Sequence, residues 1–160
     1  MTEGALAGLR VVDLTRILAG PLCAMWLGDM GADVIKVERP GRGDDTRAWG
    51  PPFVGTESAY FLGVNRNKRS LTLDLTTDGG RAVLRELIIT ADVVVDNFKI
   101  GTLDRWGLTD DWYNEHAPTV VRCTVSGYGS SGPKAGLPGY DFILQAETGL
   151  MSITGETDGE

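Results

Sequence analysis

The densest positive charge in the sequence lies at residues 66–69, where Arg66, Lys68 and Arg69 fall within four residues. The whole chain carries a formal net charge of −7, so this cluster runs against the overall composition. Guanidinium and ammonium groups at such density bind phosphate or carboxylate groups. Two interpretations stay open: contact with an anionic ligand, or salt bridges that fix the chain to its own acidic residues.

Polar and cationic residues also follow segments that have the pattern of buried strands. Arg39 ends one such segment, Asn97, Lys99 and Arg105 follow another, and a glycine-rich stretch at residues 127–139 follows a third. In open α/β sheets, ligands bind beyond the carboxyl ends of the strands. We therefore expect a phosphorylated ligand at this edge, with ordinary solvated loop charge as the alternative.

Residues 127–132 read Gly-Tyr-Gly-Ser-Ser-Gly and match the GxGxxG spacing of dinucleotide-binding loops. In those loops the glycines open a helix whose N–H groups bind the pyrophosphate. Here Pro133 and Pro138 follow, so no helix can begin before about Tyr140. We interpret the stretch as a flexible loop and not as a dinucleotide site.

The composition, with 42% hydrophobic and 23% charged residues, is that of one folded domain. Cys23 and Cys123 lack CxxC spacing, which is typical of a reducing compartment. His116 is the single histidine and is placed at a helix end, so we expect neither a metal site nor a Ser–His–Asp triad. Acidic composition, short apolar runs and an N-terminus unlike a signal peptide predict a cytoplasmic protein without nucleic-acid or membrane partners.

Apolar β-branched segments alternate with segments of helical periodicity, which is typical of βαβ crossovers. The sequence predicts an α/β fold, a Rossmann-like parallel sheet with flanking helices. The expected strands lie at residues 9–14, 32–39, 71–75, 91–98 and 118–129, and the expected helices at 21–31, 76–90, 110–115 and 142–150. Residues 40–55 are rich in Gly, Pro and charge, and predict a long functional or mobile loop.

Five blocks, in unbroken order from about Leu6 to Glu160, resemble one known family. They read LRVVDLTRILAGP, GADVIKVERPGRGDDTR, NRNKRSLTLDL, ADVVVDNFKIGTLDRWGL and SGYGSSGPKAGLPGYDFILQAETGLMSITGE. Together they are similar to the amino-terminal part of the class III coenzyme A transferases, the CaiB/BaiF family. The resemblance implies a CoA-binding large domain of which residues 1–160 form the N-terminal part, a small domain outside this chain, and an interlocked homodimer.

The same resemblance implies acyl-CoA and a free carboxylic acid as substrates. CoA itself is the implied ligand, and its 3′-phospho-ADP part carries several negative charges. The residues that the resemblance places against CoA are Leu18, Ala19, Arg39, Leu73, Asp74, Leu75, Thr76, Asn97, Phe98, Lys99, Arg105, Tyr140 and Asp141. Some family members carry glutamine at Leu18, so any hydrogen bond from that amide is absent here.

The family's chemistry is covalent, with an aspartate carboxylate that attacks the acyl-CoA thioester to give a mixed anhydride. The resemblance places this nucleophile just beyond Glu160, so we expect no catalytic residue within this chain and no activity from it alone. Related α-methylacyl-CoA racemases use a histidine where this chain has Tyr140. Tyrosine, with an ordinary pKa near 10, is a poor base at neutral pH. This difference favours transfer, with racemisation and a non-catalytic CoA- or adenine-nucleotide-binding module as alternatives.

Overall fold

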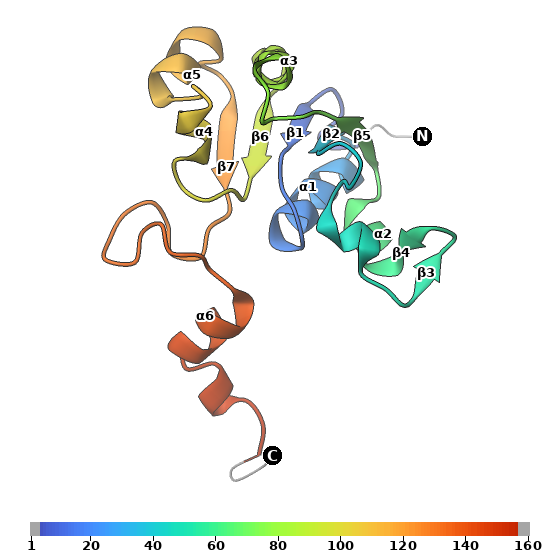
Figure 1. Cartoon of the computed structure of the whole chain (residues 1–160), viewed down its shortest axis with the longest axis vertical. Coiled ribbons are helices and arrows are strands. Elements are labelled where there is room, and N and C mark those ends of the chain that lie inside the picture. The colour runs from blue at the N-terminus through green and yellow to red at the C-terminus, as the bar shows by residue number, and fades with distance from the viewer. Residues whose placement is uncertain (1–3, 157–160) are drawn as a thin grey trace. The chain divides into compact units, whose positions relative to one another are not determined.

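The computed structural model of the protein describes residues 4–156, and the chain forms two compact units that meet between Val125 and Ser126. The first unit contains a five-stranded sheet with the order β5-β2-β1-β6-β7 (Figure 1). All its neighbouring strands are parallel, which confirms the predicted parallel sheet with flanking helices. Its strands are β1 (Arg10–Asp13), β2 (Asp33–Glu38), β5 (Lys68–Thr72), β6 (Val93–Asp96) and β7 (Val121–Thr124).

The strand order reverses at β1. The chain builds outward from β1 to β2 and then β5, and it returns to place β6 on the opposite side of β1. The connections that leave β1 and β6 therefore diverge to opposite sides at the carboxyl edge of the sheet. This is the position where open α/β sheets bind ligands.

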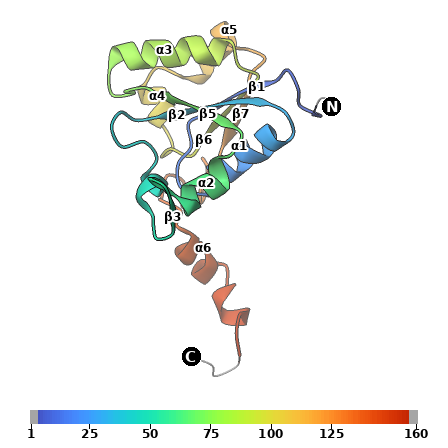
Figure 2. The same cartoon turned by 90° about the vertical axis from the view of Figure 1, so that its right-hand side faces the viewer.

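Helices cover both faces of the sheet (Figure 2). Because successive strand residues point to opposite faces, Val11 packs with Ala24 on one side while Val12 packs with Leu84 and Ile88 on the other. Ala24 lies on α1 (Ala19–Asp29), which α2 (Ala59–Asn65) contacts, and the other face carries α3 (Asp78–Ile89) and α5 (Asp110–His116). These two apolar layers fix the strands whose ends form the site.

Four segments differ from the sequence expectations. The strand expected at residues 71–75 is wrong in its bounds, because β5 pairs with β2 from Lys68 to Thr72. The expected loop at residues 40–55 contains the 3-10 helix η1 (Asp45–Ala48) and the strand β3 (Phe53–Val54), which pairs with β4 (Glu57–Ser58). Neither α2 nor the short α4 (Thr102–Arg105) was expected from periodicity, since each is too short to repeat an apolar pattern.

The second unit begins with the glycine-rich loop, and its helix α6 (Asp141–Glu147) starts at the position where a helix was first expected. The GxGxxG match therefore opens no helix, as predicted. Gly127 and Gly139 close the base of the loop: a Cβ added to either would lie 2.3 Å from the other's Cα. The 3-10 helix η2 (Met151–Ile153) follows α6.

No helix among residues 4–156 combines the length and the apolar character needed to cross a membrane.

Candidate functional site

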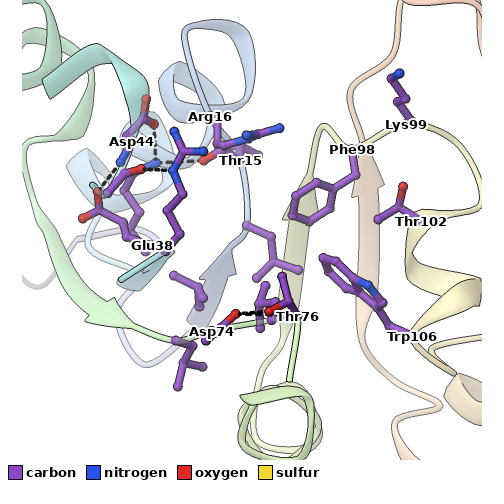
Figure 3. A pocket seen from close by; sticks show the side chains of 17 residues that line it. Thr15, Arg16, Glu38, Asp44, Asp74, Thr76, Phe98, Lys99, Thr102 and Trp106 are labelled. Carbon is purple, nitrogen blue, oxygen red and sulfur yellow. Dashed lines mark hydrogen bonds and ion pairs between the residues drawn. The ribbon is translucent and has the colours of Figure 1, made fainter. Parts of the chain in front are cut away.

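A cavity of about 370 Å³ opens at the carboxyl ends of β1, β2, β5 and β6. Figure 3 shows side chains that enter it from the loops after β1, β5 and β6. The strand pairing brings these loops together, although they are far apart in the sequence. The lining residues are Leu14, Thr15, Arg16, Lys36, Val37, Glu38, Arg39, Gly43, Asp44, Leu73, Asp74, Leu75, Thr76, Phe98, Lys99, Thr102 and Trp106.

One wall of the cavity is apolar and aromatic. The rings of Phe98 and Trp106 meet edge to face with centroids 5.2 Å apart, and Leu73 and Leu75 add aliphatic surface. Aromatic pairs in this geometry hold each other in fixed orientations. Such a wall offers a flat ring system, such as a nucleobase, a dry surface to pack on.

The rim of the cavity is cationic, with Arg16, Arg39 and Lys99 as its basic residues. Arg39 donates from Nε to the Gly43 carbonyl at 3.1 Å and pairs with Asp45. Among residues 4–156, Arg16 and Lys99 have no carboxylate within ion-pair distance. Cations left unneutralised beside a cavity create a positive potential that attracts phosphate groups.

A buried ionic network includes three residues of the cavity lining, Thr15, Lys36 and Asp44. Lys36 Nζ donates to the Thr15 carbonyl at 2.8 Å and lies 3.0 Å from Asp44 Oδ2. Asp13 accepts from Lys68 Nζ at 2.8 Å and from the main-chain N–H of Thr15 at 2.9 Å. Burial lowers the pKa of Lys68 below its ordinary value, and the Asp13 carboxylate offsets only part of this decrease. Burial raises the pKa of Asp44, but the Lys36 ammonium and the hydrogen bonds from Thr46 outweigh it, so the pKa lies below its ordinary value.

A second network, centred on the buried carboxylate of Glu38, lies next to Arg39. Glu38 accepts from Arg47 Nε at 2.8 Å and Nη2 at 2.7 Å, from Ser70 Oγ at 2.6 Å, and from the Asp44 N–H at 2.8 Å. Burial alone raises the pKa of Glu38, but these donors overcome it and lower the pKa to about 2. The network fixes the loop after β2, which carries Arg39.

The turn after β1 is held in a strained conformation. Ile17 has φ of 74°, a region that β-branched residues rarely occupy and that costs on the order of 1–3 kcal/mol. Asn97 clamps the preceding residue: its Oδ1 accepts from the Arg16 N–H at 2.9 Å and its Nδ2 donates to the Arg16 carbonyl at 2.7 Å. Asp44 lies on the other side, with Oδ1 at 3.4 Å from the Ile17 N–H.

The structure brings part of the sequence-predicted site together. Arg39, Leu73, Asp74, Leu75, Thr76, Phe98 and Lys99 all line the cavity. Asp74 uses its carboxylate within its own turn, where it accepts from the N–H of Thr76 at 3.0 Å and from Oγ1 of Thr76 at 2.6 Å. The role of these residues in binding CoA stays a prediction.

Six other predicted residues do not line it. Leu18 and Ala19 are exposed at the start of α1, and Asn97 holds the Arg16 main chain. Arg105 donates from Nη2 to Oγ1 of Thr102, a lining residue, at 2.9 Å. Tyr140 and Asp141 belong to the second unit.

Sequence reasoning missed Arg16, Lys36, Glu38, Asp44 and Trp106 among the lining residues. A usable signal existed for three of them. Lys36 and Glu38 are charged residues that alternate with apolar ones inside a predicted strand. Charges at such positions are almost never buried unless they are paired. Arg16 had a signal like that of Arg39, because both are cations near the carboxyl end of a predicted strand.

The cationic cluster at residues 66–69 belongs to the fold, which decides between its two interpretations. The side chain of Lys68 is only 2% exposed and donates to Asp13, to the Pro21 carbonyl at 2.8 Å and to Asn65 at 2.9 Å. Arg66 pairs with Asp29 at 2.5 Å and Arg69 with Asp33 at 2.6 Å. All three cations are therefore neutralised by the protein's own groups.

Comparisons with known proteins agree with this architecture. The family model described as CoA-transferase family III matches residues 6–160. The chain is 52% identical to the succinyl-CoA:glutarate CoA-transferase of Mus musculus and 50% identical to the succinate–glutarate CoA-transferase of Agrobacterium fabrum, in each case over 97% of its length. It spans only 36% and 40% of those relatives.

A solved structure of a CaiB/BaiF family protein from Brucella suis superposes with a TM-score of 0.93 at 49% identity, over 99% of this chain and 43% of that one. The likeness covers the sheet, the helices and the loops that form the cavity. The chain therefore belongs to CoA-transferase family III.

Proposed function

We propose that the full gene product transfers CoA from an acyl-CoA to a free carboxylic acid. The observation that carries this proposal is the family match over residues 6–160. The cavity supports it, because an aromatic wall beside Phe98 suits the adenine ring and a cationic rim suits the phosphates of CoA. The proposal also assigns this chain to the N-terminal part of a CoA-binding large domain in an interlocked homodimer.

The substrates we propose are succinyl-CoA as donor and glutarate, or another short dicarboxylate, as acceptor. Both relatives described above are named for succinyl-CoA or succinate together with glutarate. Identity of 50% or more over 97% of this chain supports substrates of the same class.

The proposed chemistry passes through an acyl-aspartyl anhydride. An aspartate carboxylate, located beyond Glu160, attacks the donor thioester and releases CoA thiolate. The acceptor carboxylate displaces the donor acyl group to give a new anhydride and the free donor acid. CoA thiolate then attacks the acceptor acyl carbon, forms the new acyl-CoA and regenerates the aspartate. Dividing one exchange into such steps lowers each barrier. The described residues contribute by holding the nucleotide part of CoA in place throughout.

Incubation of the full gene product with succinyl-CoA and glutarate should yield glutaryl-CoA, detected by mass spectrometry. A panel of dicarboxylic and monocarboxylic acceptors would define the substrate range. Hydroxylamine added during turnover should convert the activated aspartate into a hydroxamate on a peptide beyond residue 160. No new thioester with any acceptor would overturn the proposal, and exchange of an α-proton in its place would indicate a racemase.

Arg39→Ala and Arg105→Ala should each weaken CoA binding by about 1.5–3 kcal/mol, the range of a hydrogen bond to a charged group. This corresponds to roughly 10- to 150-fold in Kd, measured by calorimetric titration. Arg66→Ala is the matched control, because Arg66 is an exposed arginine paired with Asp29 that neither lines the cavity nor, unlike Arg105, hydrogen-bonds a lining residue. Equal affinity for all the variants and the unmodified protein would contradict the assignment of Arg39 and Arg105.

A further inference from the structure

We propose that Arg16 binds a phosphate group of CoA and that Asn97 is the positioning residue that holds it there. This inference rests on the proposed function, because it assigns two residues to the CoA site. Arg16 lies in the turn after β1 at the rim of the cavity, and its side chain is exposed. It meets no carboxylate within ion-pair distance in the described part of the chain, unlike Arg39 and the three cations of residues 66–69.

The residues around Arg16 hold its guanidinium group beside the aromatic wall of the cavity. Its guanidinium carbon lies 5.9 Å from the centroid of the Phe98 ring, and Phe98 itself forms part of the aromatic wall. Figure 3 shows Arg16 and Phe98 reaching the cavity from the loops after β1 and β6. A guanidinium presents several donors in one plane and matches the oxygens of a phosphate with two parallel hydrogen bonds.

Asn97 fixes the main chain of Arg16 and not its side chain. Both the N–H and the carbonyl of Arg16 are bonded to the Asn97 amide, at 2.9 and 2.7 Å. The next residue, Ile17, has a positive φ, so the turn would relax to another conformation without such restraints. The amide of Asn97 has already used its carbonyl and one N–H in this clamp. Asn97 would therefore affect a ligand mainly by holding Arg16 in position.

The experiment is a calorimetric titration of the full gene product and its variants with CoA and with 3′-dephospho-CoA. Arg16→Ala should weaken CoA binding about 10- to 100-fold, and Arg16→Lys should weaken it less, because the charge remains while the planar fork is lost. If the loss disappears with 3′-dephospho-CoA, Arg16 binds the 3′-phosphate; if the loss persists, Arg16 binds the diphosphate. Arg69→Ala is the control for removal of one exposed positive charge at the opposite edge of the sheet.

The positioning role has its own readout. Asn97→Ala should weaken CoA binding in the unmodified protein and have no further effect when Arg16 is already alanine, since coupled residues are not additive. Additive losses would show that Asn97 does not act through Arg16. The inference would be overturned if Arg16→Ala bound CoA as tightly as the unmodified protein, or lost no more affinity than Arg69→Ala. Either result would leave the proposed CoA transfer intact. An unmodified protein that binds no CoA would overturn both.

Discussion

Replacing Asp13 by alanine should lower the free energy of unfolding by about 3–5 kcal/mol, because it leaves the buried ammonium of Lys68 without its carboxylate. Asp13 is fully buried, and its Oδ2 lies 2.8 Å from Lys68 Nζ and 4.0 Å from Lys36 Nζ. The Lys68 side chain is only 2% exposed, so water cannot solvate its ammonium in place of Asp13, whereas Lys36 keeps Asp44 at 3.0 Å. Urea unfolding of the full gene product, followed by tryptophan fluorescence, measures the change.

The matched control is Asp33→Ala. Asp33 also pairs with a cation of the 66–69 cluster, Arg69, but the two side chains are 42% and 66% exposed. Exposed pairs contribute only about 0–1 kcal/mol, so this variant should stay close to the unmodified protein. In a double variant that combines Asp13→Asn with Lys68→Met, the loss should be smaller than the sum of the single losses. Equal destabilisation by Asp13→Ala and Asp33→Ala would contradict the network.

Glu38 should make the protein sensitive to acid. Its folded-state pKa of about 2 lies below the ordinary value of 4.5, so its contribution to stability is fully present above pH 4.5 and is lost as the pH falls toward 2. The difference in pKa corresponds to about 3 kcal/mol at neutral pH. The side chain is only 3% exposed, so solvent screening reduces this contribution little.

Glu38→Gln should therefore cost about 3 kcal/mol at pH 7, since an amide NH₂ would face the donors of Arg47, Ser70 and the Asp44 main chain. The gap in stability between this variant and the unmodified protein should narrow as the pH falls below 4.5. Glu57→Gln serves as the control, because Glu57 pairs with the same Arg47 at 2.8 Å but is 37% exposed. A gap that stays constant from pH 7 to pH 2 would refute the assignment.

Much of the fold could be predicted from local sequence. The segments that became β1, β2 and β6 are short apolar runs rich in valine and isoleucine, and α3 has a clear apolar face. These patterns are local, because a buried strand or an amphipathic helix needs the right residues at the right spacing. The start of β5 was not predictable in this way. Lys68, Arg69 and Ser70 are polar, and they join the strand because β2 offers unpaired main-chain groups beside them.

The candidate site, like the fold, could be predicted only in part from local sequence. Sequence placed Arg39, Phe98 and Lys99 at the carboxyl ends of strands, and parallel pairing then carries such ends to one edge. It could not tell which cations remain available to a ligand. That depends on partners far away in the chain: Lys68 meets Asp13 across 55 positions, and Asn97 meets Arg16 across 81.

The sequence by itself therefore determined the family, the parallel sheet and the edge at which the cavity opens. Only the tertiary structure decided that the 66–69 cluster is neutralised within the protein while Arg16, at the rim, meets no carboxylate among residues 4–156. The physical reason is that strand propensity acts over a few neighbouring residues. The availability of a charge depends instead on burial and on the carboxylates that folding brings within a few ångströms.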